Sequence, residues 1–591
     1  MKKLLFLLVF TLLVFTTTCF GATYYIDFTS GNDASAGTAE GTAWKTIPGT
    51  RNTGDTDWQA TDWGSGTFNS GSKVPAGTIF RIKPGTTHDS SDGGQIDIES
   101  TYYDADATAA NPIKFVAYQA WAAASGTITF DGTGITTGAN AGLIRSYDIP
   151  GLEFDGEVTN GITIQDTPYN GMTIGTSDAL EIGTDAMLDG AVVKYIKFSN
   201  CGTTYTSGDN QVPVLFFEHF QNVTVDNIEI DGNDLYLNGI QFGAQHRGCS
   251  GTVTDSSFHD LTGTDGGGIG ILSNNSTITY TNVTVYGCNK GFDLGEQDGN
   301  DVAFTAKVIN STFYNNATGA NFNGASGRTS DIKVYLINNI FRDNTLYGSK
   351  TYARGPFQSY IVHNVFDNNG TDADNDSTNL MMHSDGCDEE GVFTAFLYNN
   401  IFYKPAGESN FCNYYTGDGT EGYDTNFTMT GDYNAWIDNT ANASAVFADL
   451  NFTGCQSDPP IAYDYDADGP GNNTGNWYTD DDEPGNGTLH YHCDEHSNTA
   501  DSIPFTDVSG HDYTLTEAYV GTDISGETWY TSEMGVDRNS VARVGDWDIG
   551  AYDFVGGAPD PVDPPAGLTI TGGTGCIFTG GTGSQITGAT D

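Results

Sequence analysis

Hydrophobic and polar residues alternate over short segments along most of this chain, and similar segments recur. NVTVYGCNKGFDL (282–294), NSTFYNNATGANF (310–322) and NNIFRDNTLYGSK (338–350) are degenerate copies of one pattern. An alternation with a period of two is typical of β-strands rather than helices. The large apolar residue after each Asn-rich start gives the series Phe198, Ile230, Phe258, Val285, Phe313, Phe341, Phe366 and Phe402. A repeat at this spacing is typical of a solenoid.

Two further columns keep step with this series. Five residues before each apolar anchor comes a second apolar column: Val193, Val225, Val253, Tyr280, Val308, Leu336, Ile361 and Leu397. Three residues before, from the second coil on, comes a polar column: Asn227, Asp255, Asn282, Asn310, Asn338, His363 and Asn399. Asn tolerates a left-handed backbone and bonds to an equivalent Asn one coil above. We therefore expect a turn at this column, with side chains bonded from coil to coil.

A third strand should follow the next turn, where a glycine recurs. These glycines are Gly239, Gly268, Gly291, Gly319 and Gly348. The residues one and three places later are mostly apolar and should face inward, whereas those two places later should face outward: Gln241, Gly270, Asp293, Asn321 and Lys350. Because neighbouring coils stack ~4.8 Å apart, we expect these five to form one exposed row.

Segments near both ends of the chain carry a family resemblance. TYYIDFTSGNDASAGTAEGTAWKTI (23–47), GTIFRIKPGTT (77–87) and NPIKFVAY (111–118), with GHDYTL (510–515) and GDWDIGAYDF (545–554), resemble secreted right-handed parallel β-helix proteins of the pectate-lyase-like superfamily. The resemblance implies an all-β, right-handed, single-stranded parallel β-helix over residues 23–554. It indicates a fold more than an activity, because the superfamily includes lyases, hydrolases, esterases, tailspikes and adhesins.

The N-terminal residues have the pattern of a secretory signal. Lys2 and Lys3 precede an apolar run, and small residues follow at Gly21 and Ala22. The run is too short for a mature membrane-spanning helix, so an N-terminal anchor is the weaker alternative. We expect a signal peptide over 1–22 and a secreted or cell-surface mature chain.

The rest of the chain divides by composition and period. We expect a cap and first coils over 23–190, regular coils over 191–404, a loop-rich acidic insertion over 405–500, a closing segment over 501–554, a Pro-rich linker over 555–566 and a Gly/Thr-rich tail over 567–591.

The formal net charge of −54 bears on the partners. Such a chain repels nucleic acid and anionic lipid, so we expect no nucleic-acid partner. No segment after the first 22 residues is apolar enough to cross a membrane, so we expect no membrane insertion of the mature chain. The many carboxylates offer ligands to a hard cation such as Ca²⁺. Self-association is left open.

Basic residues are rare, yet five of the 22 Lys and Arg lie between residues 328 and 354. The resemblance implies a lyase in which Ca²⁺ or basic side chains neutralise a uronate and a Lys or Arg removes a proton. Such a base needs a depressed pKa beside cationic neighbours. Candidate catalytic residues are Lys350, Arg354, Arg247 and His246; candidate substrate-binding residues are Gln241, Asn321 and Arg328; and Asp293 with Glu296 would hold a cation.

Two alternatives remain. A glycoside hydrolase would need two carboxylates ~5–9.5 Å apart, for which Asp265 and Asp293 are candidates. A non-catalytic adhesin or filament-forming protein would use the Asn, Thr and Asp face for contact and cation binding. The leading hypothesis is a secreted protein that binds or cleaves an extracellular, uronate-containing polysaccharide by β-elimination.

The acidic insertion carries two candidate metal sites. Asp464, Asp466 and Asp468 alternate before Gly469, as in a calcium loop, but no Glu closes the loop at position 12. HYHCDEH places His490, His492 and His496 close together, which suits Zn²⁺ or Cu²⁺ or else an exposed His-rich loop.

The cysteines of the mature chain are even in number, but their pairing cannot be deduced from sequence. Two disulfides are expected among Cys387, Cys412, Cys455 and Cys493. Cys201 and Cys288 lie three coils apart, roughly 14 Å at the coil spacing, and cannot bridge directly.

Overall fold

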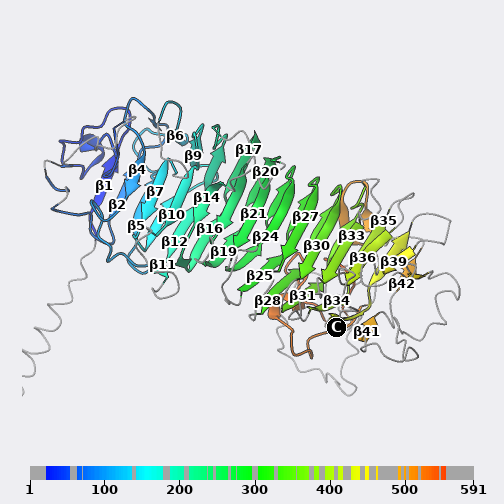
Figure 1. The fold of residues 1–591 in the computed structure, drawn as a ribbon. Helices are drawn as coiled ribbons and strands as arrows, with labels where there is room; N and C mark the ends of the chain where they lie inside the picture. The colour runs from blue at the N-terminus through cyan, green and yellow to red at the C-terminus, as the bar shows by residue number, and fades with distance from the viewer. Residues whose placement is uncertain are drawn as a thin grey trace, which may run out of the picture.

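The computed structural model of the chain describes residues 21–52, 63–64, 66–68, 71–135, 142–176, 187–204, 212–235, 237–243, 248–263, 268–274, 276–295, 304–324, 331–353, 356–371, 378–384, 393–404, 410–416, 427–438, 446–450, 461–463, 490–493, 498–500, 505–516, 521–544 and 547–553. Within these residues the chain is a right-handed parallel β-helix, as the sequence predicts (Figure 1). Each coil contributes one strand to each of three long sheets, here numbered in the order in which a coil meets them.

Sheet 1 contains β1 (Thr23–Ile26), β2 (Ile79–Ile82), β5 (Ile113–Ala117), β8 (Leu152–Asp155), β12 (Ala191–Lys194), β16 (Val223–Asp226), β19 (Ser250–Thr254), β22 (Thr277–Thr281), β25 (Phe304–Ile309), β28 (Ile332–Ile337), β31 (Phe357–Val362), β34 (Phe393–Tyr398), β37 (Phe427–Asp432) and β41 (His490–Cys493).

Sheet 2 contains β3 (Thr87–His88), β6 (Ile128–Asp131), β9 (Ile162–Gln165), β13 (Ile196–Ser199), β17 (Glu229–Leu235), β20 (Ser257–Leu261), β23 (Thr284–Tyr286), β26 (Thr312–Tyr314), β29 (Ile340–Arg342), β32 (Val365–Asp367), β35 (Ile401–Lys404), β38 (Ala435–Asp438) and β42 (Asn498–Ala500).

Sheet 3 contains β4 (Ile96–Ile98), β7 (Ile144–Tyr147), β10 (Met172–Gly175), β14 (Pro213–Phe217), β18 (Asn238–Phe242), β21 (Ile269–Asn274), β24 (Lys290–Gly295), β27 (Thr318–Asn323), β30 (Tyr347–Ala353), β33 (Thr378–Ser384), β36 (Asn410–Thr416), β39 (Val446–Leu450) and β40 (Ile461–Tyr463). Smaller elements are the pairs β11 (Leu188–Asp189) with β15 (Phe220–Gln221) and β43 (Phe505–Asp507) with β44 (Asp512–Leu515), and the 3₁₀ helices η1 (Glu40–Thr42) and η3 (Ser532–Gly535).

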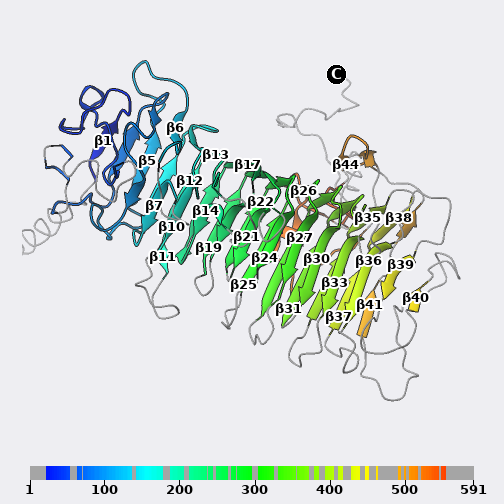
Figure 2. The same ribbon diagram turned by 45° about the horizontal axis from the view of Figure 1, so that its top comes forward.

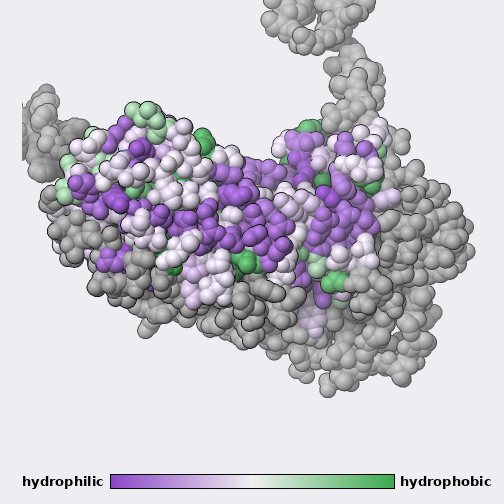
Figure 3. Space-filling model, turned by 90° about the horizontal axis from the view of Figure 1, so that it is seen from above, coloured by the Kyte–Doolittle hydropathy of each residue, from purple (hydrophilic) through white to green (hydrophobic). Residues whose placement is uncertain are grey.

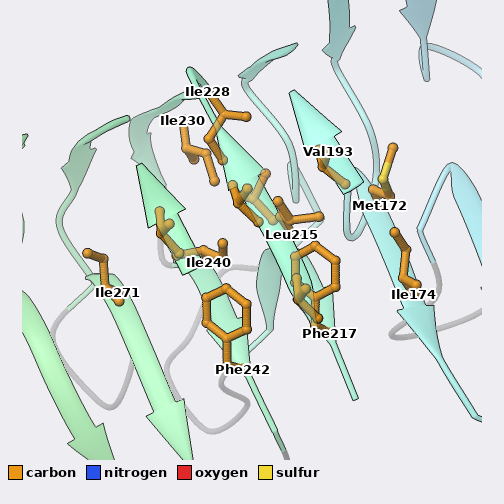
Figure 4. Packing of buried hydrophobic residues seen from close by; sticks show 14 of the residues in the cluster. Met172, Ile174, Val193, Leu215, Phe217, Ile228, Ile230, Ile240, Phe242 and Ile271 are labelled. Carbon is orange, nitrogen blue, oxygen red and sulfur yellow. The ribbon is translucent and has the colours of Figure 1, made fainter. Parts of the chain in front are cut away.

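The apolar columns of the sequence form the interior. All eight anchors of the Phe198 series pair coil to coil on sheet 2, and the Val193 series does the same on sheet 1. Phe341 stacks between Phe313 and Phe366, with ring centroids 5.1 and 4.9 Å away. Phe217 and Phe242 stack in the same way on sheet 3 (Figure 4). Stacking therefore buries an apolar face that one coil could not bury alone.

The polar column lies at the turn from sheet 1 to sheet 2, as predicted. All seven residues of the column have positive φ, from 49° at Asp255 to 58° at His363. The coil-to-coil bonding, however, comes mostly from the residue that follows. The Asn364 side chain accepts the Asn339 backbone N–H at 2.9 Å and donates to Asn400 Oδ1 at 3.0 Å. The left-handed residue turns the chain, and its successor points inward and bonds along the stack.

One position of the predicted outward row on sheet 3 is wrong. Gln241 pairs with Leu272, not with Gly270, and Leu272 pairs with Asp293. The register of β18 and β21 makes Gly270 the partner of Gly239, because Ile240 pairs with Ile271. This coil contains several glycines, and Gly270 rather than Gly268 occupies the position equivalent to Gly239.

The C-terminal segment folds back onto earlier coils of the solenoid, mainly between Ile309 and Phe402. Trp529 packs on the stacked rings of Tyr360 and Phe396 outside sheet 1, with centroids 5.7 and 5.1 Å away. Arg538 donates to the carbonyl oxygens of Ser311 and Asn338 at 2.9 and 3.2 Å. In Figure 2, β44 stands beside β35 near the C-terminal end of the solenoid.

Several other predictions meet the structure only in part. Cys201 and Cys288 do not bridge each other, as expected; both are free and buried, and so is Cys249. The predicted disulfides concern side chains outside the described residues. No helix in the described part of the chain is long and apolar enough to cross a membrane. The predicted signal peptide, linker and tail lie almost wholly outside that part.

Candidate functional site

The outer face of sheet 2 carries a polar cluster on three neighbouring coils. On β17, Ile230 points into the interior, so its neighbours Glu229 and Asp231 point outward. The next coil places His259 directly beside Asp231. The alternation that builds the core therefore gathers ionisable side chains on the opposite face.

Short contacts link this cluster. The His259 ring contacts two carboxylates, with Nδ1 2.8 Å from Asp260 Oδ2 and Nε2 3.5 Å from Glu229 Oε1. Lys197, one coil before, holds Glu229 Oε1 at 2.7 Å and lies 3.9 Å from Asp231 Oδ2. We call these five residues the carboxylate cluster.

The charges within the cluster decide its ionisation. Burial is the largest single influence and by itself would raise the pKa of Glu229, but the hydrogen bond and charge of Lys197 and the other favourable contacts together outweigh it, so the pKa lies below its usual value. Asn160 and the charge of His259 act in the same direction as Lys197. Glu229 is therefore a carboxylate at neutral pH, suited to accept a hydrogen bond or hold a cation.

The carboxylate cluster also has ligands for a divalent cation. One oxygen each of Glu229 and Asp231 and a ring nitrogen of His259 lie within 4.8 Å of one another. The ammonium of Lys197 already supplies positive charge at Glu229. A Ca²⁺ ion bound to these ligands would have to compete with that ammonium.

A row of rings continues from His259 along the coils. His259 stacks on Tyr286 with centroids 4.8 Å apart, and Tyr286 stacks on Tyr314 at 4.9 Å. The guanidinium carbon of Arg342 then lies 4.1 Å above the Tyr314 ring. Burial, with the charges of nearby carboxylates, raises the pKa of Tyr286, so its hydroxyl remains a hydrogen-bond donor. We call Asp231, His259, Tyr286, Tyr314, Arg342 and Asp367 the outer row of sheet 2.

The outer row lies on a hydrophilic face. Figure 3, which looks down on the sheet 2 side, shows hydrophilic side chains gathered in a band along the long axis. The row combines carboxylate, imidazole, phenol and guanidinium groups on a rigid sheet. Both faces of the Tyr286 and Tyr314 rings are occupied within the row, so such a surface offers a sugar hydrogen-bonding groups and ring edges.

The row predicted on sheet 3 is present but differs in character. Asn321 pairs with Asp293 on one side and with Lys350 on the other, so these three share one wall as predicted. The prediction of exposure is wrong for Gln241, Asp293 and Asn321, which are 6%, 3% and 5% exposed. They are covered because they bond within the fold.

Asp293 shows this bonding most clearly. Asn321 Nδ2 donates to one Asp293 oxygen at 2.6 Å, and Lys290 Nζ holds the other at 3.1 Å. A cation at Asp293 would have to displace Lys290. Lys350 is half-buried, with its ammonium 5.2 Å from the Tyr347 ring centre. Its catalytic role stays a prediction.

Other predicted site residues lie outside the described part of the chain: Arg354, Arg247, His246, Arg328, Glu296, Asp265, Asp464, Asp466, Asp468 and His496. His490 and His492 fall on β41, where alternate residues share a face, but their side chains are outside that part too. The Ca²⁺ and transition-metal predictions therefore remain predictions.

Sequence reasoning missed the outer row of sheet 2, although a signal was present. The residues directly after the apolar anchors Ile230, Phe258, Val285 and Phe313 are Asp231, His259, Tyr286 and Tyr314. The clustered basic residues between 328 and 354 indicated instead the strand of Lys350 on sheet 3.

Comparison with known proteins adds the following. No protein-family model and no curated protein matches the sequence. Among solved structures, the chain is similar to pectate lyase Pel9A (12% identity, 90% of this chain and 96% of that chain, TM-score 0.35). It is also similar to a rhamnogalacturonan lyase (13%, 64% and 82%, TM-score 0.34) and to XylC in complex with xylose (9%, 90% and 98%, TM-score 0.42).

Proposed function

We propose that this protein is a secreted, carbohydrate-active protein that binds an extracellular polysaccharide along the outer row of sheet 2. The observation that supports the proposal is the continuous stack His259–Tyr286–Tyr314, with Arg342 above Tyr314 and the carboxylate cluster beside it.

The chemistry that we propose at this row is β-elimination in a uronate-containing chain. The reaction would use the neutral form of His259, with the hydrogen on Nδ1, which Asp260 contacts, and the lone pair on Nε2. Nε2 would take the proton at C5, the C4–O bond would break, and a C4–C5 double bond would form. The leaving oxygen takes a proton from the Tyr286 hydroxyl or from water.

Hydrolysis is the second candidate, and one observation favours it. Oxygens of Glu229 and Asp231 lie within 4.8 Å of each other, close to the separation of ~5–5.5 Å in retaining glycosidases. Hydrolysis also suits the acidity of the carboxylate cluster, because a neutral sugar is not repelled by it. The two reactions differ in their product, since only elimination leaves an unsaturated sugar.

A panel of neutral and uronate polysaccharides tests both candidates, with and without Ca²⁺. Elimination raises the ultraviolet absorbance of unsaturated uronates, whereas hydrolysis releases reducing ends without that absorbance. His259→Gln should lower turnover by roughly 10²–10⁴-fold, as expected for loss of a general base. Glu153→Gln controls for disturbance of a partly buried ionic network, because Glu153 is held by Lys114 at 2.5 Å and Lys194 at 3.1 Å, as Glu229 is held by Lys197, but lies on sheet 1.

Three results would overturn the proposal. Unchanged turnover in His259→Gln with loss in Lys350→Ala would move the site to sheet 3. Equal loss in His259→Gln and Glu153→Gln would mean that the variants act through the fold. No binding and no turnover across the panel would favour the adhesin or filament-forming alternative.

A further inference from the structure

The outer row of sheet 2 is covered at one end by the C-terminal hairpin, which we define as β43 and β44. The row passes in register from Tyr314 to Arg342 and then to Asp367. At Asp367 the hairpin closes over the row: the Tyr513 hydroxyl donates to Asp367 Oδ2 at 2.7 Å, and Asp367 is only 4% exposed. His511 of the hairpin touches Arg342, with Nε2 3.3 Å from its Nη1.

The composition of sheet 2 changes at the same place. The outward column beside the row is polar on the earlier coils, with Ser257, Thr284 and Thr312. It then becomes apolar, with Ile340, Val365, Ile401 and Ala435. Phe505, Tyr513 and Leu515 of the hairpin pack on these apolar residues. The hairpin is therefore an integral part of the fold, packed on an apolar patch of sheet 2.

The opposite end of the row remains polar. On the coils before His259, the positions in register with the outer row are Gln165, Ser199 and Asp231, which are all half-buried. A ligand that lies along the row can therefore extend past Asp231 but meets the hairpin just beyond Arg342.

We propose, resting on the proposed function, that the protein recognises the end of a polysaccharide chain, with the terminal sugar against Arg342 and the C-terminal hairpin. A chain that ran straight through would have to occupy the volume that Tyr513 fills above Asp367. His511 and Arg342 face the terminal sugar, and the sugars before it lie over Tyr314, Tyr286 and His259. The hairpin is thus the determinant of chain-end specificity.

Binding stoichiometry tests this proposal without requiring turnover. A polysaccharide that the full-length protein binds is partly depolymerised into fractions of known mean length, and the protein bound per gram at saturation is measured by calorimetry. Chain-end recognition predicts that a tenfold shorter fraction binds about ten times more protein per gram, because the number of ends rises in proportion. Recognition within the chain predicts constant binding per gram, which would overturn the proposal.

A variant tests the role of the hairpin itself. Replacing residues 506–514 by a Gly/Ser linker of equal length should make binding per gram independent of chain length. If end-dependent stoichiometry persisted in this variant, the hairpin would not be the determinant. Should the variant fail to fold, the length series of the unmodified chain still decides. Absence of binding to any polysaccharide would instead overturn the proposed function, and with it this inference.

Discussion

Replacing Asp367 by asparagine should stabilise the protein at neutral pH and have little effect at pH 3.5. Burial raises the pKa of Asp367 to about 6 from an ordinary value of 3.8. The charge of Asp343 acts in the same direction, while the Tyr513 hydroxyl and Arg342 oppose it. Asparagine cannot ionise, yet it keeps an oxygen that accepts the hydrogen bond of Tyr513.

The direction of the pH dependence of stability follows from proton binding to Asp367. Because its pKa is raised on folding, Asp367 keeps its proton longer in the folded state than in the unfolded state. The folded state therefore binds more protons between about pH 3.8 and 6, and the free energy of unfolding falls as pH rises through this window. At about 1.36 kcal/mol per pKa unit, the rise from 3.8 to about 6 amounts to about 3 kcal/mol of stability lost above pH 6.

Urea unfolding at a series of pH values measures this contribution as the difference between Asp367→Asn and the unmodified protein. The difference should be near zero at pH 3.5 and approach about 3 kcal/mol in favour of the variant at pH 7. Asp512→Asn, on the exposed side of the same hairpin, controls for the loss of one negative charge. A difference that stays flat from pH 3.5 to 7 would refute the reasoning, as would destabilisation by the variant at pH 7.

Three further predictions concern the stack and the cluster. Asn364→Ala leaves buried donors and acceptors without partners, so the free energy of unfolding in urea should fall by about 3 kcal/mol. A fall of less than about 1 kcal/mol would contradict the coil-to-coil hydrogen bonding of the asparagines. Phe341→Ala should cost roughly 3–5 kcal/mol in the same assay, and a cost near zero would mean that the rings do not pack. At Gly287, where φ is +65°, a Cβ would lie 2.7 Å from Asp260 Oδ1. Gly287→Ala should therefore push Asp260 away from His259 and lower turnover, with unchanged turnover counting against the Asp260 role.

The regular coils could be predicted from the sequence because stacking repeats one set of constraints. Every coil must bury the same positions, so the anchor position from Phe198 to Phe402 stays large and apolar even though the residue varies among Phe, Ile and Val. The prediction failed where several candidates satisfied one constraint: either Gly268 or Gly270 could have opened the strand in its coil, and only the register of β18 and β21 decides between them.

The candidate site was less predictable for two reasons. His259 and its neighbours occupy the position after an anchor, which was available from the repeat, but nothing in a single sequence marks that position as chemically special. The position of the C-terminal hairpin could not be predicted from the sequence, because Tyr513 contacts Asp367 across a separation of 146 residues. Contacts within the stack repeat from coil to coil, whereas this contact occurs once and leaves no period to detect.

Polysaccharide binding by a matched pair of tyrosine variants tests the central claim most directly. Tyr314 and Tyr118 are both half-buried, and each carries an arginine over its ring, Arg342 at 4.1 Å and Arg81 at 4.2 Å. Only Tyr314 lies in the outer row of sheet 2. We predict that Tyr314→Ala weakens binding at least roughly tenfold, or about 1.4 kcal/mol, while Tyr118→Ala binds like the unmodified protein. Equal affinities in the two variants would contradict the assignment of the outer row as the binding site.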